Sequence, residues 1–142
     1  MSKLLLAVDG SACSARAGQW VIDSVKAMKA PAEVHLVTVQ PAIVSGEVRR
    51  FVGSEAIEGF QREEGEKALG PARRQLEQAA VAFTPHILIG HVAESIVDSA
   101  VKHGCASIVM GTRGLGGVSG LILGSVASQV IHLSAVPITL IK

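Results

Sequence analysis

The sequence predicts an α/β protein in which a single doubly wound, five-stranded parallel sheet carries helices on both faces. Short apolar runs alternate with longer segments whose apolar residues recur every three or four positions, as expected for buried strands alternating with amphipathic helices. The chain has 142 residues, which suits one domain over 1–142, and 49% of them are hydrophobic, enough for a core. Only 3% are aromatic, so that core is aliphatic.

The chain opens with a strand, a helix and a second strand. The apolar run at 3–8 ends at Asp9-Gly10-Ser11 and is typical of a strand buried on both faces. Apolar side chains then recur at spacings of four and three over 13–28, which predicts a helix that Pro31 ends. The second strand is expected at 33–39.

The middle of the chain is strongly charged. Seven Glu and six Arg or Lys lie between 47 and 77, so this section is expected to be a solvated part of the same domain. A helix is predicted from about 55 to 82, with an interruption near Gly70-Pro71, since proline is tolerated in the first turn of a renewed helix.

The last third repeats the alternation of strand and helix. The predicted elements are a strand at 86–89, a helix at 93–103, a strand at 107–110, a helix at 125–133 and a strand at 136–141. With right-handed crossovers this order gives a parallel sheet. Ligands of such sheets lie at the carboxyl ends of the strands, which directs attention to Asp9, Val39 and the segment after 110.

That segment, 111–125, holds six of the chain's fifteen glycines. Successive backbone N–H groups of such a loop can form a nest for an anion, and a helix that starts at Ser125 would attract phosphate. The segment is not a Walker A loop, because no Gly-Lys pair occurs in the chain, and it does not complete GxGxxG. Glycine content alone leaves a phosphate cradle and a flexible loop without a ligand equally open.

The spacing Gly111-x2-Gly114-x9-Gly124-Ser125 resembles the nucleotide-binding signature of the universal stress proteins, in particular their ATP-binding branch. The resemblance also covers 4–11, Gly90 with 93–96, and 136–138, and so extends over the whole chain. It implies a Rossmann-like fold similar to that of adenine nucleotide α-hydrolases. The implied nucleotide contacts are Ala7, Asp9, Val39, Met110, Gly111, Thr112, Arg113, Gly114, Gly116, Gly117, Gly124, Ser125 and Val126.

The resemblance also assigns roles. Asp9 would hold the adenosine with Ala7 beside it, and Val39 would contact the adenine. Met110 would flank the nucleoside, 111–117 would wrap the ribose and phosphates, and 124–126 would bind the outer phosphates. The implied cofactor is ATP, with Mg or Mn held mainly by the phosphates.

The function implied is that of a stress-response regulator or nucleotide-linked signalling module. The residues supply no catalytic set, because they include no nucleophile elbow and no paired carboxylates near the glycines. Two alternatives stay open: a nucleotide-free dimeric module that acts through protein contacts, and a slow ATPase. An enzyme of the α-hydrolase type ranks last.

Charge and hydropathy restrict the partners. A net charge of +1 argues against nucleic acid, and no apolar run approaches the roughly 20 residues of a membrane helix. The first apolar run is too short for a signal peptide, so the cytoplasm is expected, with Cys13 and Cys105 reduced and buried. His86 and His91 do not have a recognised metal-ligand spacing and are expected to be structural or surface residues.

The segment Val136–Ile141 predicts a homodimer. It is apolar at nearly every position, and the last strand of an open sheet should be an edge that invites pairing. Universal stress proteins commonly dimerise through this strand, so the resemblance implies the same contact. The regulatory protein partners stay unknown.

Overall fold

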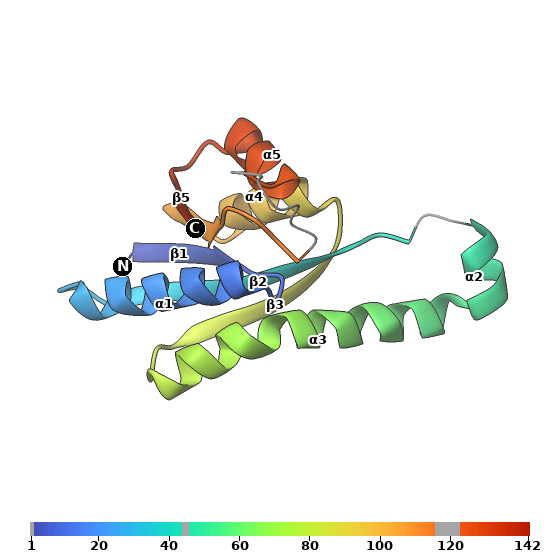
Figure 1. Ribbon diagram of the computed structural model, residues 1–142, viewed down its shortest axis with the longest axis horizontal. Coiled ribbons are helices and arrows are strands. Elements are labelled where there is room, and N and C mark those ends of the chain that lie inside the picture. The colour runs from blue at the N-terminus through green and yellow to red at the C-terminus, as the bar shows by residue number, and fades with distance from the viewer. Residues whose placement is uncertain (1, 44–45, 116–122) are drawn as a thin grey trace.

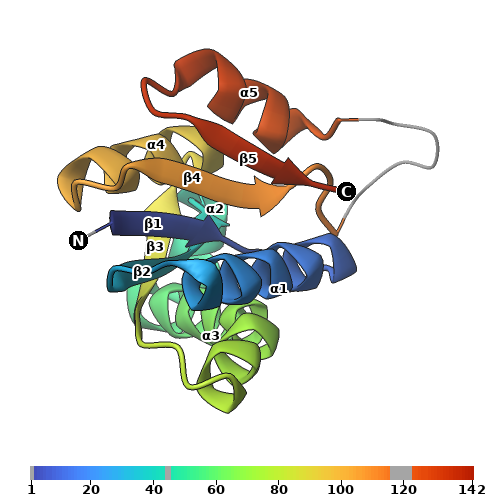
Figure 2. The same ribbon diagram turned by 90° about the vertical axis from the view of Figure 1, so that its left-hand side faces the viewer.

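The computed structural model describes residues 2–43, 46–115 and 123–142, and these form a parallel sheet covered on both faces (Figure 1). In chain order the elements are β1 (Ser2–Ala7), α1 (Ala12–Ala27), β2 (Ala32–Pro41), α2 (Gly46–Val52), α3 (Ser54–Gln78), β3 (Phe83–Gly90), α4 (Val92–Lys102), β4 (Ser107–Gly111), α5 (Ser125–Leu133) and β5 (Ile138–Ile141). The strand order is β3-β2-β1-β4-β5, with every pair parallel. Helices α1 and α3 cover one face and α4 and α5 the other (Figure 2). The predicted fold class is confirmed.

Alternation along the strands divides the core into two layers. In β1, Leu4 and Leu6 belong to the cluster beneath α1 and α3, whereas Leu5 and Ala7 belong to the cluster beneath α4 and α5. Leu5 and Leu6 are both fully buried, because a central strand of a doubly wound sheet has no solvent face. This explains why the sequence shows a continuous apolar run there.

The middle of the chain differs from the prediction. The structure adds a short helix, α2, and α3 continues through Pro71 without the interruption expected at Gly70-Pro71. Leu69, Ala72 and Leu76, on either side of the proline, are buried against the sheet. Their packing holds the helix together across the lost backbone hydrogen bond.

The edge strands also differ in length. β3 begins at Phe83 and includes Pro85, although proline cannot donate to a strand ladder. It is tolerated because β3 is an edge strand and pairs only with β2. β5 begins at Ile138 rather than Val136, which leaves Pro137 before the strand.

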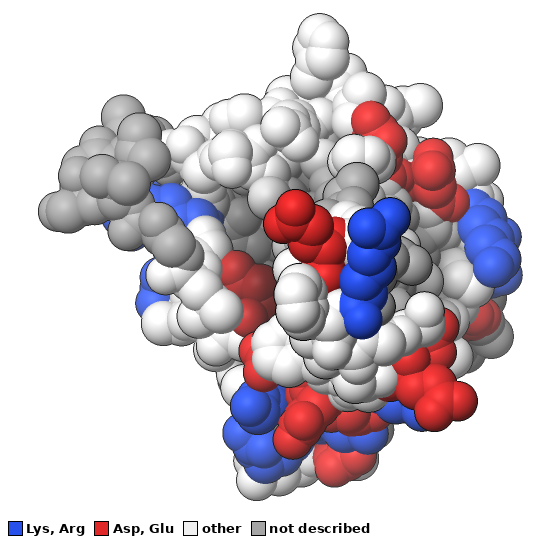
Figure 3. Space-filling model, turned by 90° about the vertical axis from the view of Figure 1, so that its right-hand side faces the viewer, with Lys and Arg blue, Asp and Glu red and all other residues white. Residues whose placement is uncertain are grey.

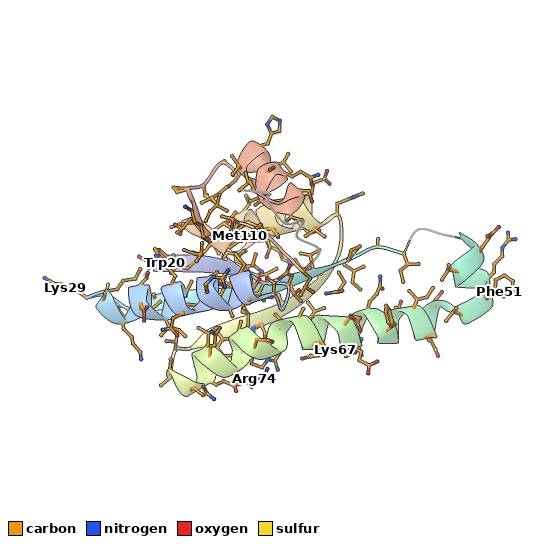
Figure 4. The ribbon with its side chains drawn as sticks, viewed as in Figure 1. Trp20, Lys29, Phe51, Lys67, Arg74 and Met110 are labelled. Carbon is orange, nitrogen blue, oxygen red and sulfur yellow. The ribbon has the colours of Figure 1, made fainter. Side chains whose placement is uncertain are left out.

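Helices α2 and α3 project beyond the sheet. Phe51 of α2 is 91% exposed and lies at the far end of the molecule (Figure 4). Acidic and basic side chains alternate over this end, without a patch of one sign (Figure 3). No helix among the described residues combines the length and hydropathy that crossing a membrane requires.

Candidate functional site

A cavity of about 480 Å³ lies at the carboxyl ends of β1, β2 and β4. Its place follows from the topology: β1 continues to β2 on one side, while β4 pairs on its other side, so the strand order reverses at β1. Such a switch point leaves a crevice above the strand ends. The register places Ala7 beside Met110 at the edge of this crevice.

The structure brings together the residues that the sequence predicted for the site. The cavity is lined by Ala7, Asp9, Val39, Met110, Gly111, Thr112, Arg113, Gly114, Gly124, Ser125 and Val126. Gly116 and Gly117 lie outside the described residues. That these residues contact a nucleotide stays a prediction.

One wall of the cavity is apolar. Val37 and Val39 of β2 and Met110 of β4 are buried at its base, and Val92 and Ile96 reach it from α4. A pocket of this volume with an apolar wall and a few polar groups has the usual character of a small-molecule site. The apolar wall suits a flat, weakly polar ring system.

The opposite wall is organised by Asp9. Its Oδ1 accepts hydrogen bonds from the Ser11 N–H and the Ser14 hydroxyl, both at 2.9 Å. Its Oδ2 accepts one from the Leu115 N–H at 3.0 Å. The carboxylate thereby joins the end of β1 and the first turn of α1 to the glycine segment, which lies 106 positions further along the sequence.

The start of α5 lies at the same cavity. Gly124 is the N-cap, and it has no side chain with which to cap the helix. The first intrahelical bond runs from the Ser128 N–H to the Gly124 carbonyl, so the N–H groups of 125–127 precede the helical ladder. Ser125 and Val126 line the cavity, and the positive end of the helix dipole favours an anion there.

Two glycine-segment groups are engaged within the protein. The Thr112 N–H donates to the Ile141 carbonyl at 2.8 Å, and the Gly124 N–H donates to the Thr112 carbonyl at 2.7 Å. Gly124 is therefore not a phosphate donor through its N–H, and its backbone φ of −74° is open to any residue. Its contribution is the space that a side chain would take: an added Cβ would lie 3.2 Å from the Thr112 carbonyl oxygen.

Cys13 lies beneath the glycine segment. Its thiol donates to the Ile141 carbonyl at 3.0 Å and lies 3.8 Å from the Thr112 hydroxyl. Burial alone would raise the pKa of this thiol, but hydrogen bonds from the Arg113 backbone and from Thr112 outweigh it and lower the pKa below its ordinary value. The side chain of Arg113 is exposed at the cavity rim, free to meet an anion.

Comparison with known proteins assigns the chain. The model of the universal stress protein family matches residues 1–142. The chain belongs to this family. Universal stress protein MJ0531 of Methanocaldococcus jannaschii is 34% identical over 99% of the chain and 81% of its own length. Universal stress protein YxiE of Bacillus subtilis is 27% identical over 99% of both.

Solved structures agree with the fold. The structure of hypothetical protein MJ0577 superposes with a TM-score of 0.83 at 25% identity, covering 99% of this chain and 95% of that one. The universal stress protein of Archaeoglobus fulgidus in complex with dAMP superposes with a TM-score of 0.71 at 23% identity, covering 100% and 98%.

The sequence prediction missed part of the lining of this universal stress protein. The unpredicted residues are Val8, Ser14, Val37, Val92, Ile96 and Ala127. Ser14 had a detectable signal, since a hydroxyl one turn into the helix after Asp9 can reach back to the strand end. The apolar residues had none, because each of them also fits a core position.

Proposed function

We propose that this universal stress protein binds ATP in the cavity at the carboxyl ends of the strands and acts as a nucleotide-linked regulator. The observation that carries the proposal is the pairing of an apolar wall at Val39 and Met110 with a helix N-terminus at Ser125 in one cavity. Solved universal stress proteins in complex with cAMP, AMP and dAMP support an adenine nucleotide as the ligand class.

The residues fit the parts of the nucleotide. The adenine would lie against Val39 and Met110, and Asp9 would face the ribose. The phosphates would meet the N–H groups at the start of α5 and the Arg113 guanidinium, which binds phosphate as a charged donor. A bound Mg or Mn ion would be held mainly by the phosphates and would neutralise part of their charge.

The helix start supports a preference for ATP over AMP. Each backbone hydrogen bond to a charged oxygen contributes about 1.5–3 kcal/mol, so removal of two phosphates should weaken binding measurably. Calorimetry on the purified chain should give a lower Kd for ATP than for AMP. Equal affinities would contradict the phosphate assignment, and no binding of either would contradict the nucleotide assignment.

A regulatory role is favoured over catalysis because Asp9, the carboxylate among the described lining residues, is held in place by the protein itself. Asp9 is hydrogen-bonded to three protein groups, Ser11, Ser14 and Leu115. Native mass spectrometry of the protein as purified tests this directly: retained ATP supports a nucleotide-linked regulator, retained ADP a slow ATPase, and a ligand-free chain the nucleotide-free interaction module.

We also propose a homodimer through the C-terminal strand, 136–141. The Pro137 carbonyl accepts from the Ile108 N–H of β4, and the Ile141 carbonyl accepts from the N–H of Thr112, the residue after β4. By strand alternation, the backbone groups of 138 and 140 face away from β4, along the open edge of the sheet. A second copy of the chain could pair with them. The proposed compartment is the cytoplasm, supported by two cysteines that are buried and free.

A further inference from the structure

Three histidines from separate elements meet at the edge of the sheet opposite the nucleotide cavity. His35 lies in β2, His86 in β3, and His103 is the C-cap of α4. One ring nitrogen of each lies within 4.8 Å of one ring nitrogen of each of the others. None of the three lines the nucleotide cavity.

The sheet register brings the first two together. His35 pairs with Thr84 and His86 with Val37, so the histidines are diagonal neighbours on one face of adjacent strands. Nδ1 of His35 lies 3.0 Å from Nε2 of His86. Two nitrogen ligands of one tetrahedral zinc ion lie about 3.3 Å apart, given bonds of about 2.0 Å. The pair is therefore close to the spacing that a shared ion requires.

Glu33 orients the first ligand. Its Oε1 lies 2.7 Å from Nε2 of His35. Because an ionised carboxylate can only accept, Nε2 of His35 is the donor of this pair, and Nδ1 is the nitrogen that faces His86. A carboxylate on the outer nitrogen of a metal-ligating imidazole is the usual arrangement in zinc sites, where it fixes the tautomer and raises the basicity of the ligand.

The third histidine lies at a favourable electrostatic position. His103 is stacked on His35, with ring centroids 4.4 Å apart, and tilted against His86, with ring centroids 4.5 Å apart. It ends helix α4, where the helix dipole favours a cation. The planes of stacked rings are nearly parallel, so the nitrogen lone pairs of His35 and His103 do not point at one common ion. The half-buried His103 ring must therefore turn before its nitrogen can bind the same ion as the other two.

The protein partly covers the three rings, since His86 and His103 are half-buried. His35 itself is only 5% exposed. His86 Nε2, which now donates to Nδ1 of His35, becomes a ligand when its proton moves to its own Nδ1.

We propose that His35, His86 and His103 form a binding site for a divalent first-row transition metal of the zinc type, with Glu33 as the outer-sphere partner of His35. Three imidazoles fill three of the four positions of a tetrahedral ion and leave the fourth for water or a ligand. Solvent can reach this fourth position because His86 and His103 are only half-buried. The site would be independent of the nucleotide cavity.

Titration of the chelator-treated full chain with Zn²⁺, by calorimetry and by competition with a chromogenic chelator, tests the site. We expect one ion per chain. His103→Ala and His86→Ala should each weaken binding more than tenfold, while His132→Ala, an exposed histidine of α5, should leave it unchanged. Glu33→Gln should weaken binding about tenfold or more. Co²⁺ should give the intense visible absorption of a tetrahedral site.

Two results would overturn the proposal. One is the absence of stoichiometric Zn²⁺ binding by the chain. The other is binding that survives both His86→Ala and His103→Ala, which would leave the cluster as a packing feature. Because the titration omits nucleotide, its outcome is separate from that of the proposed ATP binding.

Discussion

The Asp9 carboxylate occupies the space into which a side chain at Gly114 would point. A Cβ built on Gly114 collides with Asp9 Oδ2, and the same oxygen accepts the Leu115 N–H at 3.0 Å. The glycine therefore lets the segment after β4 approach the end of β1 closely enough for the backbone hydrogen bond. Glycine at position 114 and the carboxylate at position 9 therefore depend on each other.

Replacement of Asp9 by Asn should weaken ATP binding. Both oxygens of the Asp9 carboxylate accept hydrogen bonds, from Ser11, Ser14 and Leu115. In asparagine one of these oxygens is replaced by an NH2 group, which cannot accept and would face a donor. Loss of one such bond would loosen the glycine segment, and loss of the charge-assisted bond to the proposed ribose costs roughly 1.5–3 kcal/mol, which corresponds to a rise in Kd of about tenfold or more. Calorimetry with ATP measures it, and Asp23→Asn on the outer face of α1 is the matched control. Unchanged affinity of Asp9→Asn for ATP would show that the Asp9 carboxylate does not contribute to ATP binding.

Gly124→Val should abolish ATP binding in a folded protein. The added Cβ would lie 3.2 Å from the Thr112 carbonyl oxygen and 3.4 Å from Arg113 Cα, both backbone atoms, so the helix start must move. The displaced donors at 125–127 would then no longer face the cavity. Gly59→Val is the control, because a Cβ there meets nothing within 4 Å. A folded Gly124→Val chain that binds ATP normally would refute the site assignment.

The protein should be a dimer that Leu140→Asp dissociates. Light scattering at micromolar concentration should give about twice the chain mass of 14.7 kDa. Leu140 is half-buried beside the cluster beneath α4 and α5, so the variant also requires a thermal melt to show that it is folded. Val101→Asp, at a position of α4 that is 68% exposed, is the control. A wild-type monomer would rule out the interface and leave the nucleotide site untouched.

Two glycines of α3 should respond oppositely to alanine. Gly59→Ala meets no atom within 4 Å and should raise the free energy of unfolding by about 0.5–1 kcal/mol, because alanine restricts the unfolded chain. At Gly65 the added Cβ would lie 2.5 Å from Cγ2 of Ile87, which holds the helix close to β3. Gly65→Ala should lower that free energy by about 1–3 kcal/mol. Urea denaturation measures both, and equal effects would contradict the tight contact.

The sheet could be predicted from the sequence because buried strands and amphipathic helices leave distinct periods. The start of α5 at Ser125 was also predicted correctly, from the end of the glycine-rich segment. Helix α2 and the continuous α3 were not, since in the charged section the local signals favoured a break at Pro71. Packing of Leu69 and Leu76 against the sheet keeps α3 continuous through Pro71. Such packing cannot be recognised from a short stretch of sequence.

The same distinction holds for the sites. The glycine segment can be detected in the sequence because its residues are adjacent. The structure places the described part of this segment at the cavity. The histidine cluster was missed: spacing along the chain favoured a structural or surface role for His86. Its neighbours His35 and His103 come from other elements, and only the parallel register of β2 and β3 with the end of α4 unites them.

The bond from the Cys13 thiol to the Ile141 carbonyl spans 128 positions of the sequence. Through Thr112, the same carbonyl is linked to Gly124 and so to the start of α5. The cavity thus closes only when the most distant parts of the fold have met, and no local subset of the chain can form it. Because a ligand held there binds only the assembled fold, nucleotide should slow amide hydrogen exchange in the most protected strands as well as at the cavity.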